Sequence, residues 1–509
     1  MLVVAGPGTG KTNTIVRRIA RLIDQKVPPE QIPAITFTNR AAWEMRERVY
    51  GILGDRANRV FVGTFHLLGI SMMRSVGCEG FIICGRDEQV RILTDIVGTA
   101  KGAREAAERI SRSKNEVEPL DDGVKRVCQA YGAVLSQKGM YDFDDLIRIP
   151  LQLLETGGGA ALHGGKLAHI VVDEYQGVSP AQSRLLQLLS QRTDAAVCAV
   201  GDSDQAIYAF RGANLQNFLK FPEHFPGART VLPEENYRST GNIMATASGL
   251  IRYNKQRIHK GIIHRREVGR PITVIAVPDE RKEAEAIARE IETRTGGTSH
   301  FRLAGSKTSI DFSPATYDFS DFAVFFRTNA QAKVLREVLS EWGLPCQVVG
   351  GQQSKGLRTV MAALWAYLDT GPPEQAPLMQ ALKTAKEDAN LCKYEQDYLL
   401  SLTRAFPDMP LKEGVLAIID ELSLLGEVDA FDRRADSVAL MTLHAAKGLE
   451  FKVAFIVGVE EGLLPFTLSG SDTDVEEERR LFFVGMTRAM DDLFLLYTDL
   501  LHLAEGSSF

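Results

Sequence analysis

The sequence predicts an α/β protein with two tandem lobes, each built on a parallel sheet and each carrying a helical insertion. Short apolar runs rich in valine and isoleucine, such as HIVVDE at 169–174 and KVAFIVGV at 452–459, alternate with segments of helical periodicity. Continuous apolar strands of this kind are typical of parallel sheets covered by helices on both faces. A length of 509 residues also favours several structural units over a single domain.

The composition is that of a soluble globular protein, with 45% hydrophobic and 24% charged residues. No apolar run is long enough to predict a membrane span, and the N-terminus lacks the pattern of a secretory signal. The six cysteines form no C-x-x-C pair, which favours a reduced, cytoplasmic setting and no zinc site. A net charge of −6 argues against a polycation that coats nucleic acid, but it leaves a local basic groove open.

Two stretches interrupt the alternation of strands and helices and therefore divide each lobe. One is mostly polar and helical, and the other has apolar residues at helical spacing, as in VMAALWAYL. A stretch rich in glycine, serine and threonine at 293–318 predicts an exposed loop in the second lobe. We expect the following bounds: first lobe 1–79 and 146–240, its insertion 80–145, second lobe 241–352 and 437–509, its insertion 353–436.

A glycine-rich segment, AGPGTGKT, follows the first apolar strand and opens a helical pattern. Glycines let backbone N–H groups turn toward a triphosphate, and the helix presents its positive end. In this pattern Lys11 reaches the β- and γ-phosphates and Thr12 holds Mg²⁺. The alternative is a glycine-rich turn that contains Lys-Thr by chance, which the flanking strand and helix oppose. The predicted nucleotide contacts here are Ala5, Gly6, Pro7, Gly8, Thr9, Gly10, Lys11 and Thr12.

The segment HIVVDEYQ supplies a pair of carboxylates at the end of an apolar strand. Ligands of α/β sheets bind at the carboxyl ends of the strands. Asp173 is therefore a candidate Mg²⁺ ligand, and Glu174 a candidate for orienting or deprotonating the attacking water. Alone, such a pair is usually a solvated strand end, and the phosphate loop is what favours the catalytic interpretation.

Several segments, which run from the first residues to near the end of the chain, occur in the order of one family. They are AGPGTGKT, AITFTNRAAWEMRERV, VGTFH, YDFDDLI, VVDEYQ, VGDSDQAIYAFRGAN, NYRST, VALMTLHAAKGLEFKVAFIVGVEEGLLP and EEERRLFFVGMTRAM. Together they resemble the UvrD, Rep and PcrA group of superfamily 1A DNA helicases. The segments TLHAAKGLEF and RRLFFVGMTRA are the most specific of the set.

The resemblance implies two RecA-like lobes of the P-loop NTPase fold, called 1A and 2A, with insertions called 1B and 2B. It implies ATP hydrolysis with Mg²⁺ in a cleft between the lobes, and 3′-to-5′ movement along single-stranded DNA. The implied partners are single-stranded DNA and its junctions with duplex DNA, in repair or replication, and no membrane is involved.

The resemblance also assigns residues to the nucleotide. Gln205 is similar to the glutamine that senses the γ-phosphate, and Arg238 and Arg488 are similar to two arginines directed at that phosphate. Tyr237 resembles the aromatic residue that stacks on the base, and Glu450 the residue that contacts the ribose. The implied catalytic set is Lys11, Glu174, Gln205, Arg238 and Arg488.

Single-stranded DNA is bound by combining backbone contacts with aromatic stacking, since every base has a stackable face. The resemblance supplies candidates of both kinds, although aromatic residues in strands are more often core than ligand. We expect about half of these aromatic residues to touch DNA. The candidates are Thr36, Phe37, Thr64, Phe65, Tyr208, Phe210, Arg211 and Phe466.

Several features depart from the family pattern. The chain has no room ahead of its first strand for the glutamine segment that reads adenine, and Asn13 stands where an arginine is usual. We therefore expect a chain cut short at its N-terminus, with doubtful base selectivity. Gly177 replaces the last aspartate of the D-E-x-Q-D motif, and the insertion at 353–436 is reduced. The phosphate-handling residues all remain, so we expect a competent or near-competent ATPase core, and the departures predict weakened engagement of duplex DNA.

Three alternatives remain open at this point. One is a RecB- or AddA-like helicase subunit that lacks its nuclease. Another is a catalytically impaired remnant that binds DNA or a protein partner without turnover. The third is a different P-loop enzyme such as a kinase or GTPase, which the absence of an N-K-x-D motif and the presence of the two last segments oppose.

Overall fold

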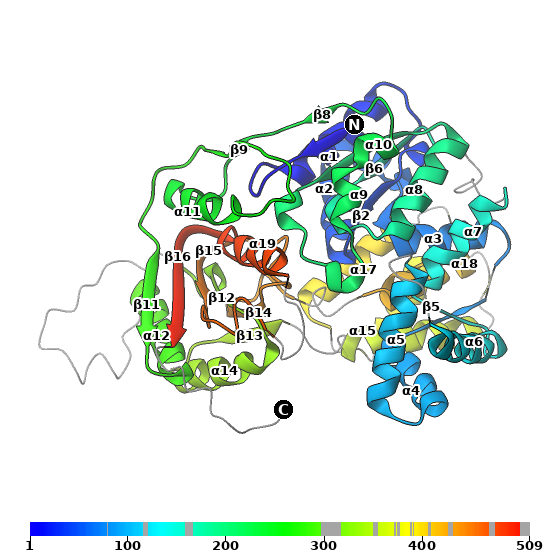
Figure 1. Cartoon of the computed structure of the whole chain (residues 1–509). Coiled ribbons are helices and arrows are strands. Elements are labelled where there is room, and N and C mark those ends of the chain that lie inside the picture. Colours follow the sequence, from blue (N-terminus) through cyan, green and yellow to red (C-terminus); the bar gives the residue numbers. More distant parts are fainter. Residues whose placement is uncertain are drawn as a thin grey trace, which may run out of the picture. The chain divides into compact units, whose positions relative to one another are not determined.

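Figure 1 shows the computed structural model of the protein. The chain divides into two compact units. The first unit comprises Met1–Ala5, Gly10–Pro233 and Gln353–Asp429, and the second unit comprises Gly6–Thr9, Glu234–Gln352 and Ala430–Phe509. The residues described are 1–78, 80–115, 121–157, 166–296, 317–349, 355–370, 373, 377–386, 389, 391–405, 409–425, 431–467 and 474–498.

The first unit is built on a six-stranded sheet in which every strand pairs in parallel with its neighbours. The order across the sheet is β3-β2-β6-β7-β1-β8. The strands are β1 (Leu2–Val4), β2 (Ala34–Thr36), β3 (Val62–Thr64), β6 (His169–Val172), β7 (Ala196–Gly201) and β8 (Thr230–Val231).

Helices with one apolar face cover this sheet. In α1 the residues Ile15, Ile19 and Ile23 recur at helical spacing, and all are buried in the core. The helices outside the insertions are α1 (Lys11–Asp24), α2 (Asn39–Leu53), α3 (Phe65–Ser75), α7 (Asp145–Glu155), α8 (Pro180–Thr193), α9 (Leu215–Leu219) and α10 (Phe221–His224). Short 3-10 turns are η1 (Pro29–Gln31), η2 (Gly54–Arg59), η3 (Tyr175–Gly177), η4 (Ser203–Gln205) and η5 (Ala209–Arg211).

The first insertion forms a small helical body with its own buried core. Its elements are the paired strands β4 (Ile82–Cys84) and β5 (Met140–Asp142), and the helices α4 (Arg86–Val97), α5 (Ala100–Lys114) and α6 (Asp122–Gln137). The buried ammonium group of Lys114 pairs with Asp142 at 2.7 Å and with Asp145 at 2.8 Å. This cation therefore ties the end of α5 to the start of α7.

The second insertion belongs to the first unit, although its neighbours in the chain belong to the second. Its helices are α15 (Lys355–Asp369), α16 (Leu378–Lys386), α17 (Lys393–Ala405) and α18 (Leu411–Ser423). Arg46 of α2 pairs with Glu421 at 2.7 Å, and Arg74 of α3 pairs with Asp420 at 2.5 Å. The division of the chain into four domains thus stays a prediction, because the chain order of an insertion does not decide which unit it packs against.

The second unit has a six-stranded parallel sheet of its own, in the order β11-β16-β15-β12-β14-β13. Figure 1 shows β16 in red beside β11 in green. The strands are β11 (Thr273–Val277), β12 (Phe322–Phe326), β13 (Cys346–Val349), β14 (Val438–Thr442), β15 (Phe451–Ile456) and β16 (Ala489–Thr498). The remaining elements are the paired strands β9 (Glu235–Asn236) and β10 (Ile263–His264), the helices α11 (Gly241–Ile251), α12 (Glu280–Arg294), α14 (Ala332–Glu341) and α19 (Val475–Met486), and the turns η6 (Phe319–Asp321) and η7 (Asn329–Gln331).

The two parallel sheets confirm the predicted fold class of two RecA-like lobes with helical insertions. The predicted exposed loop at 293–318 is only partly testable, because residues 297–316 lie outside the described residues. Its first two residues are helical, since α12 continues to Arg294. Among the described residues, no helix is both long enough and apolar enough to cross a membrane.

A buried carboxyl in the second unit predicts how stability depends on pH. Glu283 of α12 is only 5% exposed, and its Oε1 accepts a hydrogen bond from the Gly458 N–H at 2.9 Å. Burial raises the pKa of Glu283 from 4.5 to about 7, against the opposing effect of that hydrogen bond. The folded state therefore holds this proton more tightly than the unfolded state, so stability is lost as the pH rises from about 4.5 through about 7.

The substitution Glu283→Gln should remove this dependence, because the amide keeps an acceptor oxygen for Gly458 and carries no charge. Above pH 7 we expect the variant to be more stable than the wild type by on the order of 1–3 kcal/mol. Denaturant unfolding followed at a series of pH values measures this difference. Parallel pH profiles of the two proteins would contradict the assignment.

Candidate functional site

Three neighbouring strands of the first unit end at the same edge of its sheet and deliver the predicted nucleotide residues there. The strands β6, β7 and β1 lie side by side and run parallel. The phosphate loop follows β1, Asp202 follows β7, and Asp173 follows β6. This edge is where α/β sheets bind their ligands.

The phosphate loop has a backbone that glycine alone adopts without strain at two points. Gly8 and Gly10 have φ angles of 67° and 82°, in the left-handed region. At the start of the loop the Ala5 N–H donates to the Gly201 carbonyl at 2.9 Å, which fixes β1 against β7. Lys11 folds back over the loop, with its ammonium group 3.4 Å from the Ala5 carbonyl.

The middle of the loop, Gly6–Thr9, belongs to the second unit and contacts the NYRST segment there. The Asn236 side-chain amide donates to the Pro7 carbonyl at 2.7 Å, and the Tyr237 N–H donates to the Gly8 carbonyl at 3.0 Å. A Cβ on Gly8 would lie 2.5 Å from Asn236 Nδ2 and 2.7 Å from Arg238 Cβ. This position therefore has no space for a side chain.

The two carboxylates that follow β6 differ in their surroundings. Asp173 is buried, and its Oδ1 accepts the Glu174 N–H at 2.8 Å. Glu174 has a φ of 50°, which is uncommon for a residue with a side chain. Strain of this kind persists only where surrounding contacts hold it, and it is frequent at functional sites.

A chain of hydrogen bonds joins Glu174 to Gln205. The Gln176 amide donates to Glu174 Oε2 at 2.5 Å, and its carbonyl oxygen accepts the Asp202 N–H at 3.0 Å. Asp202 Oδ2 in turn accepts from Gln205 Nε2 at 2.8 Å. Sequence reasoning singled out Glu174 and Gln205 but missed Gln176 and Asp202. The only signal for these two was their position inside the quoted motifs.

The predicted DNA residues of the first unit fall into two groups. Phe37 and Tyr208 stack with ring centroids 4.7 Å apart and an angle of 13° between their planes. The Arg211 guanidinium lies 5.5 Å from the centroids of both Tyr208 and Phe210, and the Phe210 ring is 60% exposed. These four residues therefore form one cluster, called the aromatic cluster below.

The other group lies in the core. Phe65 is buried, and the Thr64 hydroxyl caps α3 by accepting the Leu67 N–H at 3.3 Å. The Thr36 hydroxyl is buried and has no hydrogen-bond partner within the described part of the chain. Thr64 and Phe65 thus have structural roles that account for their positions, and their contact with DNA stays a prediction.

The space beside Gly177 explains why a residue without a side chain suits this position. A Cβ there would lie 3.3 Å from two ring atoms of Phe37 and 3.9 Å from Tyr208. Gly177 therefore sits against the stacked pair, and a larger residue would press on the Phe37 ring. The glycine that departs from the D-E-x-Q-D pattern thus leaves space for the flat stacking of Phe37 on Tyr208.

In the second unit, Arg238 is held by Glu450. Arg238 Nε donates to Glu450 Oε2 at 2.7 Å, and Nη1 donates to the Thr487 carbonyl at 3.3 Å. Partial burial raises the pKa of Glu450, but the charge and hydrogen bond of Arg238 outweigh it, so the pKa lies below its usual value. The nearby Tyr237 ring is exposed, and its hydroxyl donates to Glu235.

Arg488 is only 2% exposed and bonds to backbone and side-chain oxygens of its own unit. Its Nε donates to the Val484 carbonyl at 2.9 Å, its Nη1 to the Leu449 carbonyl at 3.2 Å, and its Nη2 to the Thr487 hydroxyl at 3.1 Å. These bonds fix the direction of the guanidinium group. They also connect the segment before β15 to the end of α19.

Phe466 has a cationic neighbour in the second unit. The Arg327 guanidinium lies 4.8 Å from the centroid of the Phe466 ring, and Arg327 pairs with Glu478 at 2.8 Å. The Phe466 N–H also donates to Glu478 at 2.9 Å. Glu478 therefore pairs with the Arg327 guanidinium and accepts a hydrogen bond from the backbone of the GLLPF segment.

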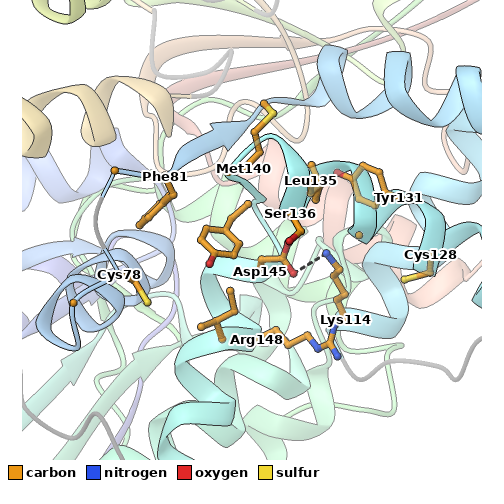
Figure 2. A pocket seen from close by; sticks show the side chains of 16 residues that line it. Cys78, Phe81, Lys114, Cys128, Tyr131, Leu135, Ser136, Met140, Asp145 and Arg148 are labelled. Carbon is orange, nitrogen blue, oxygen red and sulfur yellow. Dashed lines mark hydrogen bonds and ion pairs between the residues drawn. The ribbon is translucent and has the colours of Figure 1, made fainter. Parts of the chain in front are cut away.

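A cavity of about 440 Å³ borders the first insertion, and no predicted site residue lines it. Figure 2 shows Lys114 in this cavity with its bond to Asp145. Tyr131, Tyr141 and Arg148 also line it. The cavity therefore stands apart from the residues at the strand ends.

The sequence matches two family descriptions that together cover nearly the whole chain. Residues 1–226 match the UvrD/REP helicase N-terminal domain, and residues 232–371 and 373–499 match the UvrD-like helicase C-terminal domain.

Individual relatives are similar over almost all of the chain. A protein named ATP-dependent DNA helicase PcrA from Leuconostoc citreum is 31% identical over 97% of this chain and 79% of its own length. The protein of the same name from Staphylococcus epidermidis is 31% identical over 97% of this chain and 81% of its own. The one from Staphylococcus aureus is 30% identical over 98% and 81%.

The alignment with the Leuconostoc citreum protein runs over 614 positions, more than the 509 residues of this chain. That relative therefore has additional residues between the aligned ends, as a reduced insertion in this chain would produce. The two parallel sheets, the phosphate loop that follows β1 of the first sheet, and the matches that span both lobes agree with one another. The chain belongs to the UvrD/REP helicase family.

Proposed function

We propose that this chain is a DNA-dependent ATPase that moves 3′ to 5′ along single-stranded DNA and separates the strands of a duplex. The observation that carries the proposal is the set of groups at the carboxyl ends of β1, β6 and β7. There the phosphate loop, the carboxylates of Asp173 and Glu174, and Gln205 emerge from neighbouring strands. The aromatic cluster belongs to the same unit.

The residues that follow β1, β6 and β7 suit a nucleoside triphosphate. Lys11 supplies a positive charge for the phosphates, and the loop supplies backbone N–H groups. The Thr12 hydroxyl and the Asp173 carboxylate are hard oxygen donors, the type that Mg²⁺ prefers, so we propose them as its ligands. When bound, Mg²⁺ neutralises charge on the β- and γ-phosphate oxygens. Glu174 orients the attacking water, and Gln205 senses the γ-phosphate.

The second unit supplies the cations that we propose for the transition state. Phosphoryl transfer develops charge on the γ-phosphate oxygens, and positioned guanidinium groups stabilise that charge. Arg238 and Arg488 are already oriented by Glu450 and by backbone carbonyls. Tyr237 has an exposed ring that suits stacking on the base.

The aromatic cluster suits single-stranded DNA. Base stacking on aromatic rings is sequence-tolerant, and a nearby arginine adds attraction for the phosphates. Phe210 offers an exposed ring, and Arg211 lies beside it. We propose that nucleotide-dependent movement of the two lobes shifts the strand across these rings, which gives directional stepping.

The substitution Lys11→Ala tests the ATPase. We expect it to lower DNA-stimulated ATP hydrolysis by about 100-fold or more, because it removes the positive charge that stabilises the transferring phosphoryl group. Lys101→Ala, which removes an exposed lysine of α5, is the matched control and should leave the rate unchanged. Unchanged hydrolysis in the Lys11 variant would contradict the proposal. A wild-type chain that binds DNA without hydrolysing ATP would instead be the impaired remnant.

Strand displacement tests the direction of movement. A duplex with a 3′ single-stranded tail should be unwound in the presence of ATP, whereas a matched duplex with a 5′ tail should not. The reason is that a 3′-to-5′ motor reaches the junction only when it loads on the 3′ tail. Equal unwinding of both substrates, or preference for the 5′ tail, would refute the proposed polarity.

The substitution Arg488→Ala separates two roles of this arginine. We expect turnover to fall much more than nucleotide affinity, because the cation acts on the transition state. We also expect the second unit to lose about 1–3 kcal/mol of stability, since the Val484 and Leu449 carbonyls lose their donor. Arg336→Ala, at an exposed position of α14, is the control. ATP titrations and thermal unfolding measure the two effects, and equal losses of turnover and affinity would argue against the catalytic role.

A further inference from the structure

Gln176 belongs to the segment that carries the proposed water-orienting group, and its side chain bonds to the segment that carries the proposed phosphate-sensing group. It is 0% exposed and belongs to η3, directly after Glu174 and Tyr175. Its amide nitrogen donates to Glu174 Oε2 at 2.5 Å, and its amide oxygen accepts the Asp202 N–H at 3.0 Å. One side chain therefore bonds to both segments.

Asp202 continues the connection on the other side. It is fully buried, and it uses its two carboxylate oxygens for different partners. Oδ1 accepts the Asp204 N–H at 3.0 Å, and Oδ2 accepts Gln205 Nε2 at 2.8 Å. The position of the Gln205 amide thus depends on a residue whose own backbone is held by Gln176.

The chemistry of the two partners sets the orientation of the Gln176 amide. An ionised carboxylate only accepts hydrogen bonds, and a backbone N–H only donates. A carboxamide satisfies both at once, whereas a carboxylate in its place would offer an oxygen to each. The space is also restricted, because a Cβ on Gly201 would lie 2.4 Å from Gln176 Oε1. Gly201 therefore leaves the room that the amide needs.

The backbone of Glu174 gives a second reason to expect a functional link. Its left-handed φ of 50° is strained for a residue with a side chain, and such strain persists only where neighbouring contacts over-determine it. The bond from Gln176 is one such contact, since it fixes the carboxylate at the far end of the same residue. Losing the bond removes one contact that orients the side chain proposed to point at the attacking water.

We propose that Gln176 is a positioning residue that ties the Glu174 carboxylate to the Gln205 amide, so that water activation responds to the γ-phosphate. The proposal rests on the proposed ATPase function of the same site. It assigns to Gln176 no contact with the nucleotide, and its action passes through Glu174 and Asp202. Substitution at this position therefore changes the rate of the chemical step more than it changes the binding of ATP.

Two variants at this position separate its two bonds. Gln176→Met keeps the length of the side chain and removes both bonds, while Gln176→Glu keeps an acceptor for the Asp202 N–H and loses the donor to Glu174. We expect both to lower kcat by about 10- to 100-fold, with the KM for ATP changing by less than about threefold. Steady-state hydrolysis with saturating single-stranded DNA gives both values.

Gln182→Met is the matched control, because Gln182 is also buried and its side chain also accepts a backbone N–H, that of the residue that caps its own helix. Its Oε1 accepts the Ser179 N–H at 3.1 Å and so caps α8. This variant should lower the midpoint of thermal unfolding and leave kcat of the folded protein unchanged. Gln176 variants that lose only stability, as the control does, would overturn the proposal.

A double-substitution cycle tests the link itself. If Gln176 acts through Gln205, then Gln205→Ala should lower kcat strongly in the wild type and by less than about twofold in the Gln176→Met background. Losses that multiply independently would overturn the link. In that case the ATPase itself would still stand, because the wild-type rate and its dependence on Lys11 are measured separately.

A readout without turnover covers the case in which the wild type does not hydrolyse ATP. There the proposed function fails, and the link is judged from thermal unfolding of Glu174→Ala, Gln176→Met and the double variant. A double variant that is less destabilised than the sum of the single changes supports the hydrogen-bonded link. Additive shifts overturn it.

Discussion

The parallel pairing of β6, β7 and β1 is the constraint on which the site of the first unit depends. Val172 pairs with Ala199 and Val4 pairs with Gly201, so the three strands end at nearly the same level. Each strand is followed by a polar segment at the same edge of the sheet. Buried strands of this kind have a strongly specified register, because a slip by one residue would move apolar side chains out of the core. The register of these strands therefore sets the positions of the phosphate loop and of the carboxylates.

The groups at this edge are held by polar contacts that the low dielectric of the interior strengthens. Gln176, Asp202 and Gln205 are all buried, and each makes hydrogen bonds to the next. A buried polar group that loses its partner costs more than the bond itself contributes, so such a network moves or fails as a unit. On the neighbouring side, Gly177 sits against the Phe37 ring of the aromatic cluster. The short turn η3 therefore contacts both the segment proposed to sense phosphate and the rings proposed to stack on DNA.

The second insertion shows how buried charge selects a packing partner. Glu421 and Asp420 of α18 pair with Arg46 and Arg74 of the first unit, and Glu421 is almost fully buried. Such pairs contribute little net stability compared with apolar contacts, but removing one partner leaves an uncompensated buried charge. The pairs therefore specify where the insertion packs. In the second unit, Arg488 plays a comparable part with backbone carbonyls as its partners.

The sequence by itself determined the fold class, the alternation of strands and helices, and the groups expected to handle phosphate. Those features are local: an apolar run predicts a buried strand, and a glycine-rich turn before a helix predicts a phosphate loop. Only the tertiary structure decided that Gln176 joins Glu174 to Asp202, that Phe37 stacks on Tyr208, and that the helices of 353–429 group with the first unit. The physical reason is that the Gln176–Asp202 bond, the Phe37–Tyr208 stack and the packing of the insertion each join separate segments of the chain. Their meeting depends on strand order, side-chain packing and charge pairing, which leave no periodic trace along the chain.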